Sequence, residues 1–375
     1  MSEWKKYTIG DICEQIFAGG DAAKYLISKY QTSLYNIPIY ANSTENDGLY
    51  GYCDKAVVSR PAVTIAARGA GIGFVAFRDK PFVPIVRLIT LITNNSVDTK
   101  FLYYYLKNRK LSGDGSAIPQ ITVPMVKKET IIAPILDEQK RIANILSSLD
   151  EKIEINRKIN ARLEELAQAI FKSWFINFEP FGGKMPEDWE TCTLGDLTVE
   201  CKNRVRDKED VRVLSPISSG ELVLSDEYFT KQVYSKELSK YIIVSPNTFA
   251  YNPARINIGS IGKNNYNFDG CVSPVYVVFK VIDGYEEFIN QFIKTTVFKE
   301  EVLLRAIGGV RQTLNYNDFS LIEFYKPSLS TVTQFSQIVS SINDTIKFLN
   351  IETMRLGELR DTLLLKLMSV ELIPE

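Results

Sequence analysis

The stretch from residue 137 to residue 175 constrains the fold more than any other, because its pattern is that of one long helix. Apolar residues recur on an alternating spacing of four and three, which is the seam of a coiled coil. A helix of this length spans roughly 58 Å at about 1.5 Å per residue, so it requires a partner along its length. The seam consists of Ile142, Leu146, Leu149, Ile153, Asn156, Asn160, Leu163, Ala167, Ile170 and Trp174.

The same pattern returns near the C-terminus. A shift of 193 positions aligns residues 147–150 (SSLD) with residues 340–343 (SSIN). A Thr-x-x-Gln spacing from Thr331 to Gln334 predicts a capping box at the start of this second helix. The second seam consists of Phe335, Val339, Ile342, Ile346, Leu349, Thr353, Leu356, Arg360, Leu363 and Leu367.

Two asparagines, Asn156 and Asn160, stand in the middle of the first seam. They belong either to a solvated part of the helix or to a device that fixes the pairing register, since a buried asparagine favours one register at some cost in stability. In an antiparallel helix pair, Thr353 would be a polar neighbour of one of these asparagines.

Each long helix is preceded by a block of mixed pattern, and both blocks open with the same motif. The motif W-x-x-x-T-[IL]-G-D-[IL] occupies residues 4–12 and 189–197. The repeating unit is therefore a block plus a helix, present twice. This predicts an α/β fold in which two mixed α+β blocks accompany two long antiparallel coiled-coil helices, as a tandem repeat with pseudo-two-fold symmetry. The expected segments are 1–136, 137–179, 180–329 and 330–375.

Short apolar runs bounded by turn residues predict strands within the blocks, and longer runs predict one helix in each. In the first block we expect strands at 36–40, 56–58, 62–67, 73–77 and 128–133, and a helix at 99–111. In the second block we expect strands at 210–214, 222–224, 241–244 and 271–281, and a helix at 286–304.

The composition narrows the possible functions. Lys plus Arg number 44 and Asp plus Glu 45, so the net charge of −1 does not by itself indicate nucleic-acid binding. The chain contains no histidine, which excludes Ser-His-Asp and Cys-His catalysis and disfavours a metal site. Five scattered cysteines without a CxxC motif fit a reducing cytoplasm, and no apolar run is long enough to span a membrane.

Two motifs resemble enzyme signatures but depart from them. Residues 68–73 (RGAGIG) fail the dinucleotide pattern GxGxxG, because Phe74 stands where the last glycine is needed, and they lack the lysine of a phosphate-binding loop. Residues 252–255 (NPAR) depart from the Asn-Pro-Pro-aromatic signature of amino-methyltransferases. An enzyme in its own right is therefore disfavoured.

Polar loops that recur at matched places in the two blocks supply candidate DNA contacts. Arginine beside a glycine-rich turn, as at Arg68 and Arg255, suits base or phosphate contact, although a structural salt bridge would give the same pattern. Taken singly, such loops are more often simply solvated. The candidates are Tyr40, Asn42, Ser43, Arg68, Ser116, Gln120 and Thr122 in the first block, and Lys202, Arg204, Arg206, Asn252, Arg255, Lys263, Asn264, Arg311 and Gln312 in the second.

The whole chain resembles the specificity subunit of type I restriction-modification enzymes. The stretches that carry the resemblance are 172–181 (KSWFINFEPF), 185–189 (MPEDW), 64–69 (TIAARG), 134–139 (PILDEQ) and the opening motif. The Glu-Gln pair that begins the first long helix is weaker in the second, where only Gln334 remains.

This resemblance implies a non-catalytic subunit for DNA recognition in a restriction system that defends against phage. Two target-recognition domains would each read one half of an asymmetric bipartite site in double-stranded DNA. The helices would set the spacer and dock two methyltransferase subunits, which a restriction and translocase subunit joins. S-adenosylmethionine, ATP and magnesium would belong to those partners, with no cofactor in this chain. The outer helix face, with Lys152, Arg157, Arg162 and Glu165, is the expected docking surface.

A reading from a different class is a structural coiled-coil scaffold with two protein-binding domains and no role on DNA. Salt-dependent DNA binding, measured with a methyltransferase subunit present, distinguishes the two readings.

Overall fold

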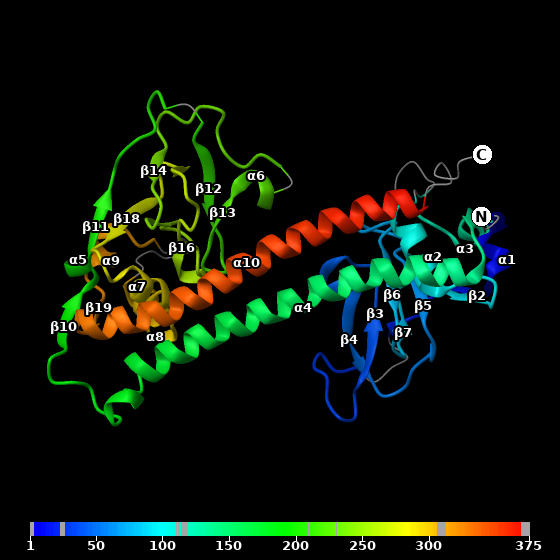
Figure 1. Ribbon diagram of the computed structural model, residues 1–375, viewed down its shortest axis with the longest axis horizontal. Coiled ribbons are helices and arrows are strands. Elements are labelled where there is room, and N and C mark those ends of the chain that lie inside the picture. Colours follow the sequence, from blue (N-terminus) through cyan, green and yellow to red (C-terminus); the bar gives the residue numbers. More distant parts are fainter. Residues whose placement is uncertain are drawn as a thin grey trace. The chain divides into compact units, whose positions relative to one another are not determined.

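The computed structural model describes residues 4–22, 27–109, 111, 113, 119–208, 210–229, 231–305 and 313–368 (Figure 1). The chain forms two compact units. Unit 1 comprises Met1–Arg157 with Asn350–Glu375, and unit 2 comprises Lys158–Leu349. Each unit therefore contains one block together with part of each long helix.

The unit-1 block is built on a four-stranded antiparallel sheet of order β2-β8-β5-β6, beside a three-stranded sheet of order β4-β3-β7 in which β3 and β7 are parallel. Helix α2 packs against β5 and β6. The elements are β1 (Lys5–Thr8), α1 (Ile9–Ile12), β2 (Cys13–Ala18), β3 (Ile37–Tyr40), η2 (Glu45–Gly48), β4 (Leu49–Cys53), β5 (Ala62–Ile65), β6 (Val75–Arg78), β7 (Val83–Pro84), β8 (Ile89–Thr93), α2 (Thr99–Lys107), α3 (Val123–Lys128) and β9 (Thr130–Ala133).

The unit-2 block repeats this plan with a four-stranded antiparallel sheet of order β11-β18-β15-β16 and a second sheet of order β13-β12-β17-β14, in which β12 and β17 are parallel. The elements are β10 (Glu190–Thr193), α5 (Leu194–Leu197), β11 (Thr198–Cys201), β12 (Arg212–Pro216), β13 (Leu222–Leu224), α6 (Ser225–Tyr228), β14 (Ile242–Val244), β15 (Phe249–Tyr251), η4 (Ile256–Ile258), β16 (Ile261–Lys263), β17 (Gly270–Val272), β18 (Val277–Val281), α7 (Glu286–Phe292), α8 (Thr296–Arg305), α9 (Tyr316–Ser320) and β19 (Glu323–Lys326).

The two long helices are α4 (Leu136–Phe175) and α10 (Leu329–Met368), with a short η3 (Glu179–Phe181) after the first. Every predicted seam position on both helices is buried or half-buried. In unit 1, Asp150 pairs with Arg360 and Asn156 with Thr353, so rising numbers on α4 meet falling numbers on α10. The helices are antiparallel, which confirms both that prediction and the expected contact of Thr353.

The polar centre of the seam is a register device rather than a solvated gap in unit 1. The side chain of Asn156 is fully buried. Its amide donates to Glu352 Oε2 at 2.7 Å and to Thr353 Oγ1 at 3.4 Å. A buried amide that finds acceptors in only one alignment disfavours the others, because a slip would leave its N–H groups without partners.

Several predicted elements differ from the structure in their ends. Helix α10 begins at Leu329, so the capping box predicted from Thr331 is wrong; that hydroxyl lies 3.0 Å from the hydroxyl of Ser328. The helix predicted at 286–304 is two helices, because Thr295 accepts a hydrogen bond from the N–H of Phe298 and caps a new start. The strand predicted at 271–281 is likewise two strands, β17 and β18.

The repeated opening motif is structural. In unit 1, the carboxylate of Asp11 accepts from the backbone N–H and the hydroxyl of Thr8 at 3.2 and 2.6 Å, which caps α1. In unit 2, Asp196 accepts from the same groups of Thr193 at 2.7 and 2.8 Å. The strands before these caps, β1 and β10, pair with β9 and β19, which lead into the long helices. The motif therefore closes each block at the base of a helix.

These caps predict a pH dependence of stability. Hydrogen bonds from Thr8 and Thr193 hold the pKa values of Asp11 and Asp196 below the ordinary value of 3.8. Stability from such groups is present above the ordinary pKa and is lost as the pH falls through the lowered one. Between about pH 5 and pH 2 the Tm of the wild type should therefore fall more steeply than that of the Asp11→Asn/Asp196→Asn variant. Parallel slopes in thermal unfolding would contradict this role.

Candidate nucleic-acid interface

In unit 1, the side chain of Asn42 ties three loops together. Its Oδ1 accepts a hydrogen bond from the backbone N–H of Ala67 at 2.9 Å, and its amide nitrogen donates to the carbonyl of Val86. The N–H of Ile121 donates to the carbonyl of Ala67 at 2.9 Å, which adds the loop before α3. The loops that follow β3, β5 and β7 and the loop before α3 therefore meet at one place.

Two of these loops carry an exposed arginine. Arg68 follows β5 and precedes Gly69, whose φ of +88° places it in the left-handed region. Arg87 follows β7 and is itself left-handed at φ +62°, directly after Val86 at φ +52°. Non-glycine residues in this region cost of the order of 1–3 kcal/mol each, so the surrounding structure must enforce the turn.

Backbone packing enforces the turn at Arg87. The N–H groups of Val86 and Arg87 donate to the carbonyls of Gly20 and Gly19 at 2.8 and 2.9 Å. A Cβ atom on Gly19 would lie 2.6 Å from the carbonyl carbon of Pro84, so a larger residue there would displace the turn. Arg87 is thus carried on a braced turn beside the loop that contains Asn42.

The other residues predicted in the first block mainly hold these loops in place. The guanidinium of Arg78 lies 3.6 Å from the centre of the Tyr40 ring, and burial raises the pKa of Tyr40 while Arg78 opposes that rise. Ser43 Oγ accepts from the N–H two residues later at 3.1 Å. Thr122 caps α3 by accepting from the N–H of Met125 at 3.4 Å.

The remaining predicted residues differ in their exposure, and some of them lie outside the described part of the chain. Gln120 is half-buried in the loop that joins the Asn42 group. Ser116, Arg311 and Gln312 lie outside the described residues. Arg206 is exposed at φ +53° in the loop after β11.

In unit 2, a hollow opens beside β11 and β18, and Lys202, Arg204 and Tyr276 are among the residues that line it. Burial raises the pKa of Tyr276, and the charge of Arg255 together with a hydrogen bond from the amide of Asn252 opposes that rise. The structure therefore brings together four of the predicted residues, two on the loop after β11 and two on the loop after β15.

The cations around this hollow are open to solvent. Lys202 Nζ lies 2.7 Å from a carboxylate oxygen of Glu200, but the lysine side chain is 75% exposed. A pair this exposed contributes about 0–1 kcal/mol, so the ammonium group can exchange its partner for a phosphate at little cost. Arg204 and Arg255 are exposed as well.

Two predicted contacts of the second block are wrong. Lys263 on β16 is buried and forms an ion pair with Glu287 of α7. Asn264 is fully buried, and its amide donates to the carbonyls of Val244 and Phe268 at 2.8 and 3.1 Å. Both side chains therefore face the interior of unit 2 and are closed to DNA, because a polar residue type in a sequence does not reveal whether the fold buries it.

The residues predicted to dock partners are all exposed, and one of them also pairs with the other long helix. Lys152 lies 3.3 Å from Glu352 of α10, so it pairs across the two long helices, while its side chain stays 46% exposed. Arg162 and Glu165 are exposed and form an ion pair at 2.6 Å along α4, and Arg157 is also exposed.

Sequence reasoning missed Arg87. It stands inside the apolar run 82–92, for which neither a strand nor a turn was predicted. A single arginine that interrupts such a run is costly to bury, and this was the available signal for a turn at that point. The structure divides the run into β7 and β8 with the left-handed turn between them.

Neither a metal cluster nor a membrane span occurs in the described part of the chain. Within the ranges given above, no group of three or more histidine, cysteine or acidic side chains could hold a metal ion. None of the helices built from those residues is both long and apolar enough to cross a bilayer.

Comparison with known proteins places the chain in a family. The profile of the type I restriction modification DNA specificity domain matches residues 1–165. The MjaIX specificity subunit of Methanocaldococcus jannaschii is 26% identical over 356 residues, which cover 85% of this chain and 79% of that protein. The C-terminal part of a type I specificity subunit from Mycoplasma pneumoniae is 36% identical over 108 residues, which cover 28% of this chain and 74% of the relative.

A solved structure shares the fold. The S subunit of a type I restriction-modification system from M. genitalium superposes with a TM-score of 0.66 at 20% identity, covering 98% of this chain and 96% of that one. At this identity the likeness supports the fold, a tandem arrangement with two long helices. Together with the sequence relatives, it leads to one conclusion: the chain belongs to the family of type I restriction enzyme specificity subunits.

Proposed function

We propose that each block binds one half of an asymmetric, bipartite site in double-stranded DNA. Block one extends over residues 1–136 and block two over residues 180–329. The two blocks share a plan of sheets but carry different side chains on their loops, so we infer that the two half-sites differ in sequence. The chain would then supply sequence recognition to a type I restriction-modification complex.

The observation that carries this proposal is a common arrangement in both units: exposed cations on loops that an asparagine braces. In unit 1, Asn42 joins the loops that bear Arg68 and Arg87. In unit 2, Asn252 accepts from the N–H of Ala254 at 3.0 Å through its side chain and from the N–H of Arg255 at 2.9 Å through its carbonyl. Arginine on a fixed backbone suits the major groove, where its planar fork matches the two acceptors of guanine.

We infer that the long helices, within 137–179 and 330–375, act as a spacer between the two recognition blocks. A helix of 40 residues is about 60 Å long. Half-sites return to one face of DNA every 34–36 Å or so. A helix of this length is sufficient to carry two readers one turn or somewhat more apart.

We further infer that this chain performs no catalytic step and binds no cofactor of its own. The lack of histidine supports this, because acid–base and metal chemistry in such complexes would then fall to other subunits. Methylation with S-adenosylmethionine, and cleavage with ATP and magnesium, would belong to two methyltransferase subunits and a restriction subunit. The net charge of −1 supports a large share of phosphate contacts from those partners.

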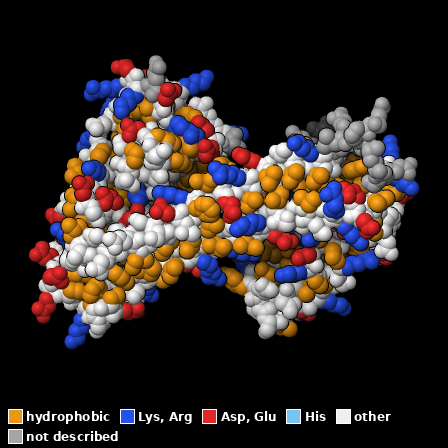
Figure 2. Space-filling view, in the orientation of Figure 1, with side chains coloured by type: hydrophobic (Ala, Val, Ile, Leu, Met, Phe, Trp, Pro, Cys, Tyr) orange, Lys and Arg blue, Asp and Glu red, His pale blue; other side chains and the backbone are white. Residues whose placement is uncertain are grey.

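A second apolar stripe on the long helices supports docking of the methyltransferase subunits. If the seam residues occupy heptad positions a and d, with Ile142 and Phe335 at d, then Ile155 and Phe348 both fall at c and are exposed. Leu166 and Leu359 both fall at g and are exposed. Figure 2 shows hydrophobic side chains gathered along both helices on this face.

The repeat distributes this stripe equally between the units. A shift of 193 converts Ile155 to Phe348 and Leu166 to Leu359. Unit 1 thus has an apolar patch of Ile155 and Leu359, and unit 2 has one of Leu166 and Phe348. In an antiparallel pair the g positions of both helices flank the same side of the seam, so each patch draws on both helices. Two equivalent patches support two copies of one partner.

The test of the proposed function is DNA binding in the presence of a methyltransferase subunit. The purified complex is incubated with genomic DNA fragments at about 50 mM and about 200 mM salt, and the retained fragments are sequenced. A recognition subunit enriches fragments that share a bipartite motif, and raising the salt removes non-specific fragments first. Retention without any shared motif, or equal retention by the methyltransferase subunit alone, would favour the scaffold instead.

Replacing Arg87 with alanine should relax recognition in one half-site. A bidentate contact to a base contributes about 1–3 kcal/mol of discrimination, so tolerance of one substituted base pair should rise roughly 5- to 150-fold. The readout is binding to a panel of single-base variants of the enriched motif. Arg60→Ala is the matched control. Arg60 is also an arginine of block one, but it lies before β5, at the opposite end of that strand from Arg68, and it forms an ion pair with Glu14. Uniform weakening across the panel would assign Arg87 to a phosphate.

A further inference from the structure

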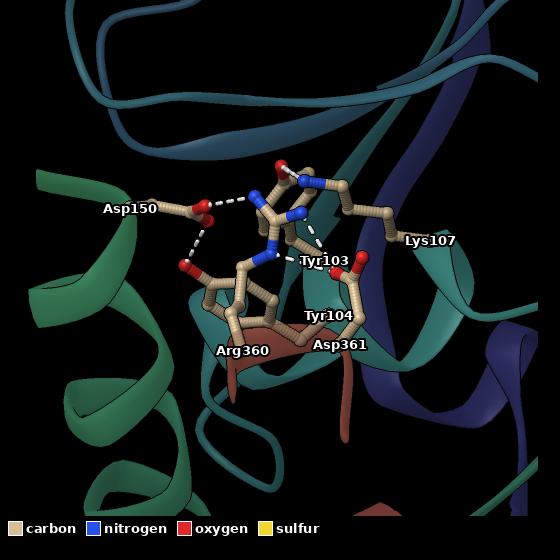
Figure 3. A network of polar contacts seen from close by, with 6 residues as sticks. All are labelled: Tyr103, Tyr104, Lys107, Asp150, Arg360 and Asp361. Atoms are coloured by element: carbon tan, nitrogen blue, oxygen red, sulfur yellow. Dashed lines mark hydrogen bonds and ion pairs between the residues drawn. The ribbon is translucent and has the colours of Figure 1, made fainter. Parts of the chain in front are cut away.

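A polar network joins the block of unit 1 to both long helices (Figure 3). The hydroxyl of Tyr104 on α2 donates to Asp150 Oδ2 on α4 at 2.7 Å. Arg360 Nη1 on α10 donates to the other oxygen, Asp150 Oδ1, at 2.7 Å. The carboxylate of Asp150 therefore accepts one hydrogen bond from the recognition block and one from the other long helix.

The network lies mostly out of water. Tyr104 is 2% exposed, and the side chains of Arg360 and Asp150 are 20% and 27% exposed. Burial raises the pKa of Tyr104 and the hydrogen bond to Asp150 raises it further, so the phenol remains a donor at neutral pH. Charges that are sheltered in this way are screened by salt less than surface pairs are.

The second repeat makes a tie at the same place with different chemistry. The shift of 193 places Asn343 on Asp150. Asn343 on α10 donates to Glu287 Oε2 of α7 at 3.0 Å, and Glu287 forms the buried ion pair with Lys263 of β16. Both blocks are thus hydrogen-bonded, from one of their own helices, to the same repeat position on a long helix.

The contacts made by Asp150 in unit 1 and by Asn343 in unit 2 differ in the residue that the other long helix contributes. The shift places Arg360 on Ala167, whose side chain ends at Cβ. In unit 2, Ala167 and Asn343 line a hollow together with Lys294 of the block. The partner helix therefore contributes a charged group to the tie in unit 1 and a methyl group at the matching place in unit 2.

We propose that Tyr104, Asp150 and Arg360 form a positioning device that fixes the angle of block one on the helix pair, and thereby limits the spacer lengths that the complex accepts. This inference rests on the proposed function. Apolar packing between α2 and α4 has no directional preference, whereas hydrogen bonds to a carboxylate weaken steeply when their angles change. Gln139, at the start of α4, accepts a hydrogen bond from the N–H of Asp98 at 2.8 Å, so the network at Asp150 is a second directional contact, further along the same helix. Two such contacts resist a tilt of the block, which would shift its DNA-reading loops.

The chain offers matched pairs of variants for the test. Tyr104→Phe removes the hydroxyl but keeps the ring in the core of unit 1. Its control is Tyr103→Phe, because that neighbouring hydroxyl only accepts from Lys107 Nζ at 2.9 Å among the contacts drawn in Figure 3. Asp361→Asn changes the exposed partner of Arg360 and serves as the control for Asp150→Asn.

The measurement is methylation by the complete methyltransferase complex of three DNA duplexes that share both half-sites. One duplex has the natural spacer, and the others are one base pair longer and shorter. We expect Tyr104→Phe and Asp150→Asn to lower the preference for the natural spacer by about tenfold, the factor that corresponds to one hydrogen bond to a charged group. Tyr103→Phe and Asp361→Asn should keep the preference of the wild type.

Equal loss of methylation on all three duplexes would mean that the network only stabilises the fold, and would overturn the inference. An unchanged preference in Tyr104→Phe, with the variant folded as judged by thermal unfolding, would overturn it too. Failure of the proposed function has a different signature. In that case the wild-type complex itself methylates no bipartite site, and both conclusions fall together.

Discussion

Replacing Glu287 with alanine is expected to lower the free energy of unfolding of unit 2 by about 3–5 kcal/mol, because it leaves a buried charge without a partner. The side chains of Lys263 and Glu287 are 6% and 14% exposed. The substitution also removes the acceptor that Asn343 uses to tie α10 to α7. The unfolding transition in urea should move to a markedly lower concentration.

Two further variants distinguish the effect of an unpaired buried charge from the effect of losing any ion pair. Lys263→Met/Glu287→Met should recover most of the lost stability, because an apolar pair of similar volume replaces a buried ion pair at little or no cost. Glu165→Ala is the control for an exposed pair. Its partner Arg162 is 81% exposed, so the effect should stay within about 1 kcal/mol. A Lys263→Met single variant that keeps its stability but loses DNA affinity would contradict the structural role.

Placing two glutamates in the unit-1 patch, by Ile155→Glu and Leu359→Glu, is expected to remove one methyltransferase subunit from the complex. Burying an aliphatic side chain contributes about 1.5–3 kcal/mol, and burying an unpaired carboxylate costs more. Affinity at that patch should fall roughly 100-fold or more. Mass measurement of the assembled complex should then show one partner copy instead of two.

The equivalent substitutions Leu166→Glu and Phe348→Glu should remove the other copy, and all four together should remove both. Asp344→Lys is the matched control, since it reverses an exposed charge at heptad position f, away from the stripe. Arg157→Glu tests the docking surface first expected from the sequence. Loss of a partner with Arg157→Glu but not with the patch variants would favour that polar face over the apolar stripe.

Periodicity explains why the helices were predictable and the blocks were less so. The 4,3 pattern runs through ten positions on each helix, so their seams and the contact of Thr353 followed directly from the sequence. Strands buried on both faces lack alternation, which is why β8 (Ile89–Thr93) was missed and why β17 and β18 were expected as one strand. The break between α7 and α8 depends on one capping hydroxyl, Thr295, which the apolar pattern does not reveal.

The candidate interface was predicted only in part, because polarity does not determine burial. Arg68, Lys202, Arg204 and Arg255 are exposed on loops, whereas Lys263 is enclosed by an acidic partner that lies 24 positions away in the sequence. The left-handed turn that carries Arg87 depends on backbone contacts with Gly19 and Gly20, which no local pattern shows. Tertiary contacts of this kind decide which polar residues remain available to DNA.

The central claim is that the two blocks are separate readers of one DNA site. The most direct test replaces residues 1–136 with the first block of a relative of different specificity and maps methylated adenines across the host genome. One half-site should change, while the other half-site and the spacer length stay as they were. A change in both half-sites, or in neither, would contradict the claim.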